Sequence, residues 1–174
     1  FKGRRDGGFV MTYTTLASIV KYPFASALAE KGHGKFGFFS TEADIFCRIA
    51  DDLGIIRKSA VGCPAEYARH PLVYLVEAAD DICYEIMDIE DAHKLKIVTY
   101  EETKRLFLDF FDEMGQNHIM QRIHDEEITE DNEKVIYMRA CVINAHERAC
   151  VDALMRHEDE IMRGKYNSSL IDSI

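Results

Sequence analysis

The stretch from Pro71 to Lys94 constrains the fold most strongly, because it contains neither glycine nor a second proline. Proline suits the first turn of a helix, where its missing N–H has no intrahelical partner to lose. Apolar residues follow at helical spacing, which predicts one long amphipathic helix. We expect its buried stripe to consist of Leu72, Leu75, Val76, Ala79, Ile82, Cys83 and Ile86.

The rest of the chain also favours helices over sheet. Its 174 residues include only 3 prolines and 10 glycines, and tryptophan is absent. Good helix formers are frequent, and 47% of the residues are hydrophobic, which is enough to form a core. No repeat of 20 to 50 residues indicates a solenoid. The predicted fold class is all-α.

The N-terminal third predicts two shorter helices. The first covers about Thr14 to Lys21 and stops before Pro23, because proline disfavours helical geometry in the preceding residue. The second begins at Ser40 or Thr41 and ends at Gly54. Between them, the glycines of Lys31–Gly37 allow the backbone to approach a neighbour closely, and residues 53–69 read as irregular.

The C-terminal part predicts further helices. Thr99 and Glu102 have the spacing of a capping box, so a helix with an aromatic buried face should begin there and close at Gly115. The segment His118–Glu127 is ambiguous. Thr129 then caps a long helical region that reaches about Gly164, as one helix or as two with a kink.

Charge and cysteine content limit the partners and the compartment. A net charge of -10, from 31 acidic and 21 basic residues, argues against a broad nucleic-acid-binding face and suits a divalent cation. Five cysteines without a CxxC pair indicate reduced thiols and a cytoplasmic protein. No apolar run approaches the ~20 residues of a membrane span, so no membrane partner is expected. The opening at Phe1, within loop-like sequence, leads us to expect more protein upstream.

Three polar residues of the central helix share one row. Asp80, Tyr84 and Asp88 are spaced i, i+4, i+8, and residues four apart are neighbours on a helix surface. The row borders the apolar stripe, so we expect it to face the edge of a cavity. A carboxylate can bind Mg²⁺ or Mn²⁺, a phenol can donate to a phosphate oxygen, and a second carboxylate can hold a sugar hydroxyl. The alternative is a solvated acidic face, formed with Asp81, Glu85, Glu90 and Asp91.

Three blocks of sequence resemble one family. The run Arg69–Tyr84, continued by Asp88–Ala92, is similar to the hallmark segment of bacterial dGTP triphosphohydrolases of the HD superfamily. Thr12–Pro23 and Lys35–Glu42 resemble two further blocks, in the same order along the chain. The resemblance implies that residues 1–174 are a single helical region, the middle to C-terminal part of an irregular helical bundle of HD-superfamily type.

The resemblance assigns roles to the row on the central helix. Asp80 matches a metal-binding aspartate, and Tyr84 and Asp88 match positions that contact the triphosphate and the deoxyribose 3′-hydroxyl. The family's reaction converts dGTP or another dNTP to a deoxynucleoside and inorganic triphosphate, with a divalent metal ion, Mg²⁺ or Mn²⁺, as cofactor.

The resemblance also assigns three cations to the substrate. Lys21 and Lys35 correspond to lysines that bind phosphates, and a looser match makes Arg139 similar to a triphosphate-binding arginine. A triphosphate needs several such donors to neutralise its charge. Family members tend to be homo-oligomers, and some respond to a nucleotide or to single-stranded DNA as an effector.

The chain departs from the family in its histidines. The family's metal-binding histidine and His-Asp pair lie well upstream of the matched aspartate, but only His33 and His70 precede Asp80 here. The pair His124-Asp125 comes after Asp80, in the wrong order, and His146-Glu147 lacks the second histidine of an HExxH motif. We therefore expect this chain to be inactive alone and the full-length protein to be a dGTP triphosphohydrolase.

Two other functions remain compatible with the sequence. One is a non-catalytic helical module that binds a nucleotide or assembles oligomers through the aromatic segment Phe107–Phe111. The other is a different HD-type phosphohydrolase that acts on signalling nucleotides.

Overall fold

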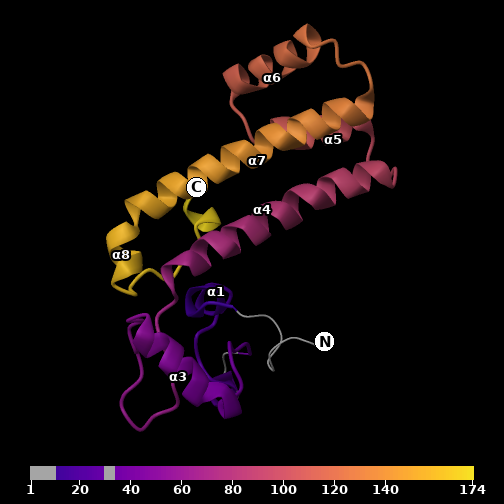
Figure 1. Cartoon of the computed structure of the whole chain (residues 1–174). Coiled ribbons are helices and arrows are strands. Elements are labelled where there is room, and N and C mark those ends of the chain that lie inside the picture. Colours follow the sequence, from indigo (N-terminus) through magenta and orange to yellow (C-terminus); the bar gives the residue numbers. More distant parts are fainter. Residues whose placement is uncertain (1–10, 30–33) are drawn as a thin grey trace, which may run out of the picture. The chain divides into compact units, whose positions relative to one another are not determined.

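The computed structural model describes residues 11–29 and 34–174 and is built from helices (Figure 1). Within these ranges β-structure is limited to isolated bridges, such as Ala25 with Phe38, so the all-α prediction is confirmed. No helix in the described part of the chain is both long and apolar enough to cross a lipid bilayer. The opening loop, residues 31–33 of the glycine-rich segment and therefore His33 lie outside the described residues.

The chain divides into two compact units. Unit 1 comprises residues 1–77 and 154–170, and unit 2 comprises residues 78–153 and 171–174. The two long helices, α4 (Pro71–Lys94) and α7 (Asp131–Arg156), contribute residues to both units. Helix α4 has the predicted bounds, which follow from its proline start and its breaker-free sequence. That residues 1–174 form one region of a larger protein stays a prediction.

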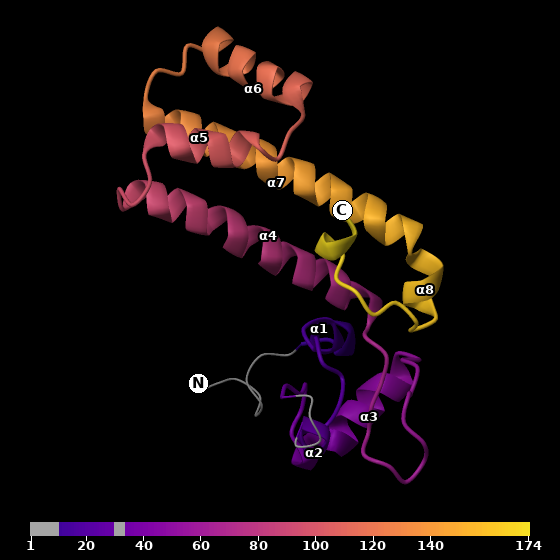
Figure 2. The same cartoon turned by 180° about the vertical axis from the view of Figure 1, so that it is seen from behind.

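Unit 1 contains short helices joined by irregular segments. They are α1 (Tyr13–Ser18), α2 (Ser26–Leu28, Figure 2), the 3-10 turn η2 (Ser40–Glu42), α3 (Ala43–Asp52) and α8 (Glu158–Met162). Thr12 caps α1 by accepting a hydrogen bond from the backbone N–H of Thr15 (3.1 Å). The structure confirms the two predicted N-terminal helices, although α1 ends before Lys21.

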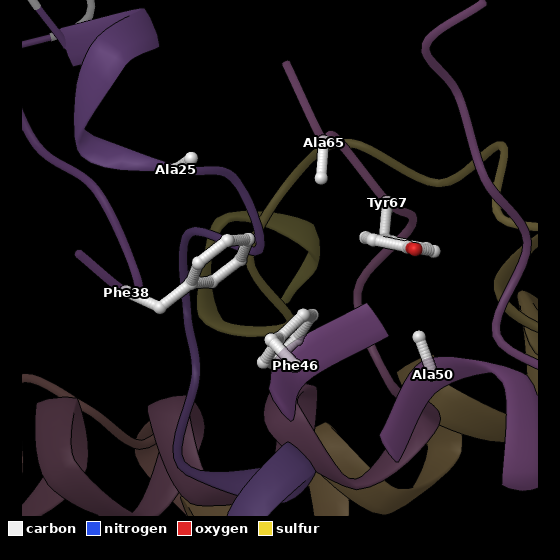
Figure 3. Close-up of a cluster of buried hydrophobic side chains, with 6 residues drawn as sticks. All are labelled: Ala25, Phe38, Phe46, Ala50, Ala65 and Tyr67. Atoms are coloured by element: carbon white, nitrogen blue, oxygen red, sulfur yellow. The ribbon is translucent and has the colours of Figure 1, made fainter. Parts of the chain in front are cut away.

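An aromatic cluster forms part of the core of unit 1 (Figure 3). The rings of Phe38 and Phe46 stack with centroids 4.3 Å apart, and Tyr67 lies 5.7 Å from Phe46. Ala25, Ala50 and Ala65 belong to the same buried cluster and lie around these rings. Because Phe38 is buried here, the segment around residue 37 is held against the segment around residue 24.

Unit 2 is a helical layer formed by parts of α4 and α7 with α5 (Tyr100–Leu108), α6 (Glu113–Asp125) and the 3-10 turn η3 (Ile171–Ser173). In Figures 1 and 2, α4 and α7 run side by side here, with α5 along α7. The largest fully buried apolar side chains of this unit are Ile86, Phe107, Val135, Met138 and Val142.

The region after Thr99 contains two helices where the sequence predicted one. The capping box is present, because Thr99 accepts from the N–H of Glu102 while the Glu102 carboxylate accepts from the N–H of Thr99 (2.8 Å). The prediction that Gly115 closes this helix was wrong. Asp112 caps α6 instead, accepting from the N–H of Gly115 (2.8 Å), so Gly115 lies in the first turn of a new helix that includes most of the ambiguous segment.

The long C-terminal helical region is two helices. Helix α7 ends at Arg156, and α8 follows after His157 and ends shortly before Gly164, which has a positive φ of 64°. The kinked version of the prediction is therefore confirmed. Helix α7 begins at Asp131, two residues after Thr129.

Candidate functional site

The row of Asp80, Tyr84 and Asp88 lies on an exposed face of α4 within unit 2. All three side chains are exposed, and Tyr84 is 67% accessible. At about 100° per residue, this face points away from Ile82, which is buried. We name it the α4 outer face, made up of Asp80, Cys83, Tyr84, Met87 and Asp88. The three side chains share one surface, as predicted, but they do not border a buried stripe.

The predicted buried stripe of α4 was wrong for most of its members. The buried apolar residues of α4 are instead Val73, Tyr74, Ala78, Ile82 and Ile86, and from Tyr74 to Ile86 they follow one another at intervals of four. The predicted stripe coincides with this buried row only at Ile82 and Ile86. Four residues of the predicted stripe are exposed, namely Leu72, Val76, Ala79 and Cys83.

A buried glutamate in unit 1 holds two cations. Glu77 is only 8% accessible, and its carboxylate lies 2.6 Å from Lys21 Nζ and 2.9 Å from Arg69 Nη1. Burial of a carboxylate is unfavourable unless positive groups and hydrogen-bond donors accompany it. Arg69 also lies over the ring of Tyr74, 5.5 Å from its centroid. Lys21 is thus fixed at one end of α4 by a charge that the sequence did not single out.

The two predicted phosphate-binding lysines meet at one aromatic ring. Lys35 Nζ donates to the Tyr22 hydroxyl (3.3 Å) and lies 5.4 Å from the ring centroid, while Lys21 Nζ lies 5.9 Å from the same centroid. Gly37 makes this possible, since a Cβ there would lie 2.2 Å from the backbone oxygen of Tyr22. The prediction of a close backbone approach in this glycine-rich segment is confirmed at Gly37.

A second buried glutamate, in unit 2, holds the third predicted cation. Glu90 is 3% accessible, and it accepts from Arg139 Nη1 of α7 and from Lys94 Nζ (2.9 Å). Burial raises the pKa of Glu90, but the hydrogen bonds from Lys94 and Arg139 outweigh it, so the pKa lies below the usual 4.5. Arg139 Nε is buried without a hydrogen-bond partner. The role of Arg139 in binding a triphosphate stays a prediction.

Sequence reasoning missed both buried glutamates, although one left a signal. Glu90 follows Ile82 and Ile86 at intervals of four, so it continues a row of buried residues instead of the row of Asp80. It was grouped with a solvated acidic face, and for Glu90 that interpretation was wrong. Glu77 follows the buried Val73 by four residues, but the predicted stripe did not include Val73, so Glu77 had no comparable signal.

The described residues do not form a metal site by themselves. They contain no group of three or more histidine, cysteine, aspartate or glutamate side chains arranged to hold an ion. The His124-Asp125 pair is exposed at the end of α6, with Nδ1 and Oδ1 3.4 Å apart. His146 uses Nδ1 to hydrogen-bond the carbonyl of Val142 (3.0 Å). A lone Asp80 carboxylate could supply one ligand to an ion completed by other residues.

The known proteins that are similar to this chain carry the same name. A deoxyguanosinetriphosphate triphosphohydrolase-like protein of Synechocystis is 31% identical over 97% of this chain. The similarly named protein of Pseudomonas aeruginosa is 31% identical over 96% of it, and that of Listeria monocytogenes is 27% identical over 95%. The chain is homologous to these triphosphohydrolase-like proteins. It spans well under half of their length, 38% for Synechocystis and 37% for Pseudomonas aeruginosa. No family model matches the chain.

The match to the triphosphohydrolase-like relatives runs through nearly the whole chain, so it includes the α4 outer face and both groups of cations. Unit 1 holds Lys21 and Lys35 around Tyr22, and unit 2 holds Asp80, Tyr84 and Asp88 on one face with Arg139 on Glu90. Each unit therefore presents polar groups of the types that bind phosphates, sugars and divalent ions.

Proposed function

We propose that this chain is the substrate-binding part of a metal-dependent hydrolase that converts dGTP or another dNTP to a deoxynucleoside and inorganic triphosphate. The observation that carries the proposal is the α4 outer face, where Asp80, Tyr84 and Asp88 are exposed in one row. The names of the homologous proteins support a triphosphohydrolase reaction.

Each member of the row has one proposed task. Asp80 supplies one carboxylate ligand to a divalent ion, for which Mg²⁺ and Mn²⁺ are the candidates because both prefer oxygen ligands. The Tyr84 hydroxyl donates to a phosphate oxygen, and the Asp88 carboxylate accepts a hydrogen bond from the deoxyribose 3′-hydroxyl. Residues four apart on a helix are close enough to contact one nucleotide together.

The cations have the task of binding the triphosphate. Lys21, Lys35 and Arg139 carry positive charges on an otherwise acidic chain, and two of them share the ring of Tyr22. Charge on the leaving triphosphate grows during cleavage, so fixed donors stabilise the transition state more than the bound substrate. The attachment of Lys21 and Arg139 to buried carboxylates suits that task, because fixed donors need little rearrangement during the reaction.

The first experiment replaces the metal-binding candidate. In the full-length protein that carries this sequence, Asp80→Ala should abolish metal-dependent release of triphosphate from dGTP. Asp91→Ala is the matched control, since Asp91 is an exposed aspartate of the same helix and should retain activity. Wild-type activity of the Asp80 variant, measured by quantifying released triphosphate, would contradict the proposal.

The isolated 174-residue chain should be inactive, because the described residues contain no group of three or more histidine, cysteine, aspartate or glutamate side chains arranged to hold the ion. A full dNTP panel in the same release assay also tests base preference. Signalling nucleotides added to that panel test the alternative that the protein is a different HD-type phosphohydrolase. Turnover by the isolated chain would show that the ligand set is complete within it.

A non-catalytic nucleotide-binding module is the second candidate. It is favoured by the lack of a metal-holding cluster among the residues that the structure describes. It predicts nucleotide binding without triphosphate release from the full-length protein. We also propose that the protein is cytoplasmic, that it self-associates and that it responds to a nucleotide or to single-stranded DNA. Native mass measurement tests the self-association, and activity assays with each effector test the response.

A further inference from the structure

Glu90 lies at the border between the buried and exposed sides of α4. It continues the row of Ile82 and Ile86, yet it is also three residues after Met87, a member of the α4 outer face. Its carboxylate is almost fully buried, with a side-chain accessibility of 4%. A buried carboxylate is energetically unfavourable at this position, because an apolar residue there would avoid the cost of removing a charge from water.

Arg139 reaches Glu90 from α7 with only part of its guanidinium. Nη1 donates to the Glu90 carboxylate, and Nε is buried without a partner. No hydrogen bond from Nη2 to another described residue is formed, and the side chain is 31% accessible. A guanidinium carries five N–H donors in a rigid plane. Anchoring through Nη1 therefore fixes the direction of Nη2 and leaves it able to donate to an oxyanion.

We propose that Glu90 is a positioning residue that anchors Arg139 so that Nη2 donates to the triphosphate of the substrate, an inference that rests on the proposed function. Lys94 completes the cluster by donating to the other Glu90 oxygen (2.9 Å). Removal of Glu90 leaves the arginine without its anchor and with more conformational freedom to lose on binding. The weakened interaction is the one with phosphate, and contacts to the sugar and base are retained.

The test compares two inhibitors of the full-length enzyme, inorganic triphosphate and deoxyguanosine. Glu90→Met removes the acceptor at similar volume, and Glu90→Gln keeps the shape and one oxygen but not the charge. We expect Glu90→Met to raise the inhibition constant of triphosphate about tenfold, with a smaller rise for Glu90→Gln. The inhibition constant of deoxyguanosine should stay unchanged in both variants. A purely structural role would weaken both inhibitors together.

Two further variants separate the possible failures. Lys94→Met removes the second partner of Glu90 and leaves the Arg139 contact in place. Triphosphate should inhibit this variant as strongly as it inhibits the wild type. Arg139→Gln should raise the triphosphate constant, and adding Glu90→Met to it should have no further effect. If Arg139→Gln raises the inhibition constant of triphosphate but neither Glu90 variant does, the positioning role is wrong and the proposed function stands. If Arg139→Gln has no effect, the phosphate-binding role of Arg139 is itself wrong.

Discussion

At the scale of single residues, the structure shows charge and burial combined on one helix. Glu77 and Glu90 both lie on α4 and are nearly inaccessible, and each contacts two cations. Buried carboxylates occur in proteins when they are paired in this way. Through Lys21 for Glu77 and Arg139 for Glu90, each glutamate links α4 to a different segment of its own unit. These glutamates connect side chains that are distant in sequence.

Loss of the Glu77 carboxylate should destabilise the protein. Glu77→Gln leaves Lys21 and Arg69 without a negative partner, and we expect a loss of about 1–2 kcal/mol in the free energy of unfolding. The loss is kept small because Lys21 is 40% accessible and water can replace part of the interaction. Urea unfolding measures it. The control is Glu85→Gln, an exposed glutamate of the same helix, expected within about 0.5 kcal/mol of the wild type; equal losses in the two variants would contradict the role of Glu77.

At the scale of elements, α4 begins at a histidine cap. His70 Nδ1 accepts a hydrogen bond from the backbone N–H of Leu72 (3.2 Å), which satisfies one of the free donors of the first turn. Pro71 provides the first helical residue at no hydrogen-bonding cost. Burial lowers the pKa of His70 below its usual 6.5, so the neutral, accepting form is favoured in the folded protein. The start of the helix that carries the candidate site therefore depends on protonation.

Acidification should weaken this cap. Because the pKa of His70 is lower in the folded than in the unfolded state, its contribution is present above pH 6.5 and is lost as the pH falls through the folded value. The protection factor of the Leu72 amide, which compares its exchange rate with the intrinsic rate at the same pH, should fall accordingly. His70→Asn keeps a cap without this pH dependence, whereas His70→Ala should cost about 1 kcal/mol at neutral pH. An identical pH response in His70→Asn and the wild type would refute the idea.

At the scale of the whole molecule, the α4 outer face is an incomplete surface. It exposes Cys83 and Met87 beside Asp80, Tyr84 and Asp88, so apolar and polar groups are open to solvent together. Under the proposed function, Asp80 needs further metal ligands from residues outside the described part of the chain. Those residues would cover this face when they bind the same ion.

The reactivity of the Cys83 thiol measures whether other residues cover the α4 outer face. The thiol is exposed in this structure, as is that of Cys63 in unit 1. A thiol reagent should modify Cys83 much more slowly in the full-length protein with a divalent ion and nucleotide than in the isolated chain, while Cys63 serves as the internal reference. Peptide mass spectrometry distinguishes the two sites. Equal rates at Cys83 in both samples would mean that the face stays open.

Local sequence determined the helices and the alignment of the candidate site. Pro71 and the absence of breakers defined α4, Thr99 and Glu102 defined the start of α5, and the interval of four placed Asp80, Tyr84 and Asp88 in one row. These features depend on residues within one or two turns of each other. Only the tertiary structure decided which side of α4 is buried and which cation each glutamate holds. Those outcomes depend on segments distant in sequence, such as Lys21 for Glu77 and Arg139 for Glu90, so helical periodicity alone could not reveal them.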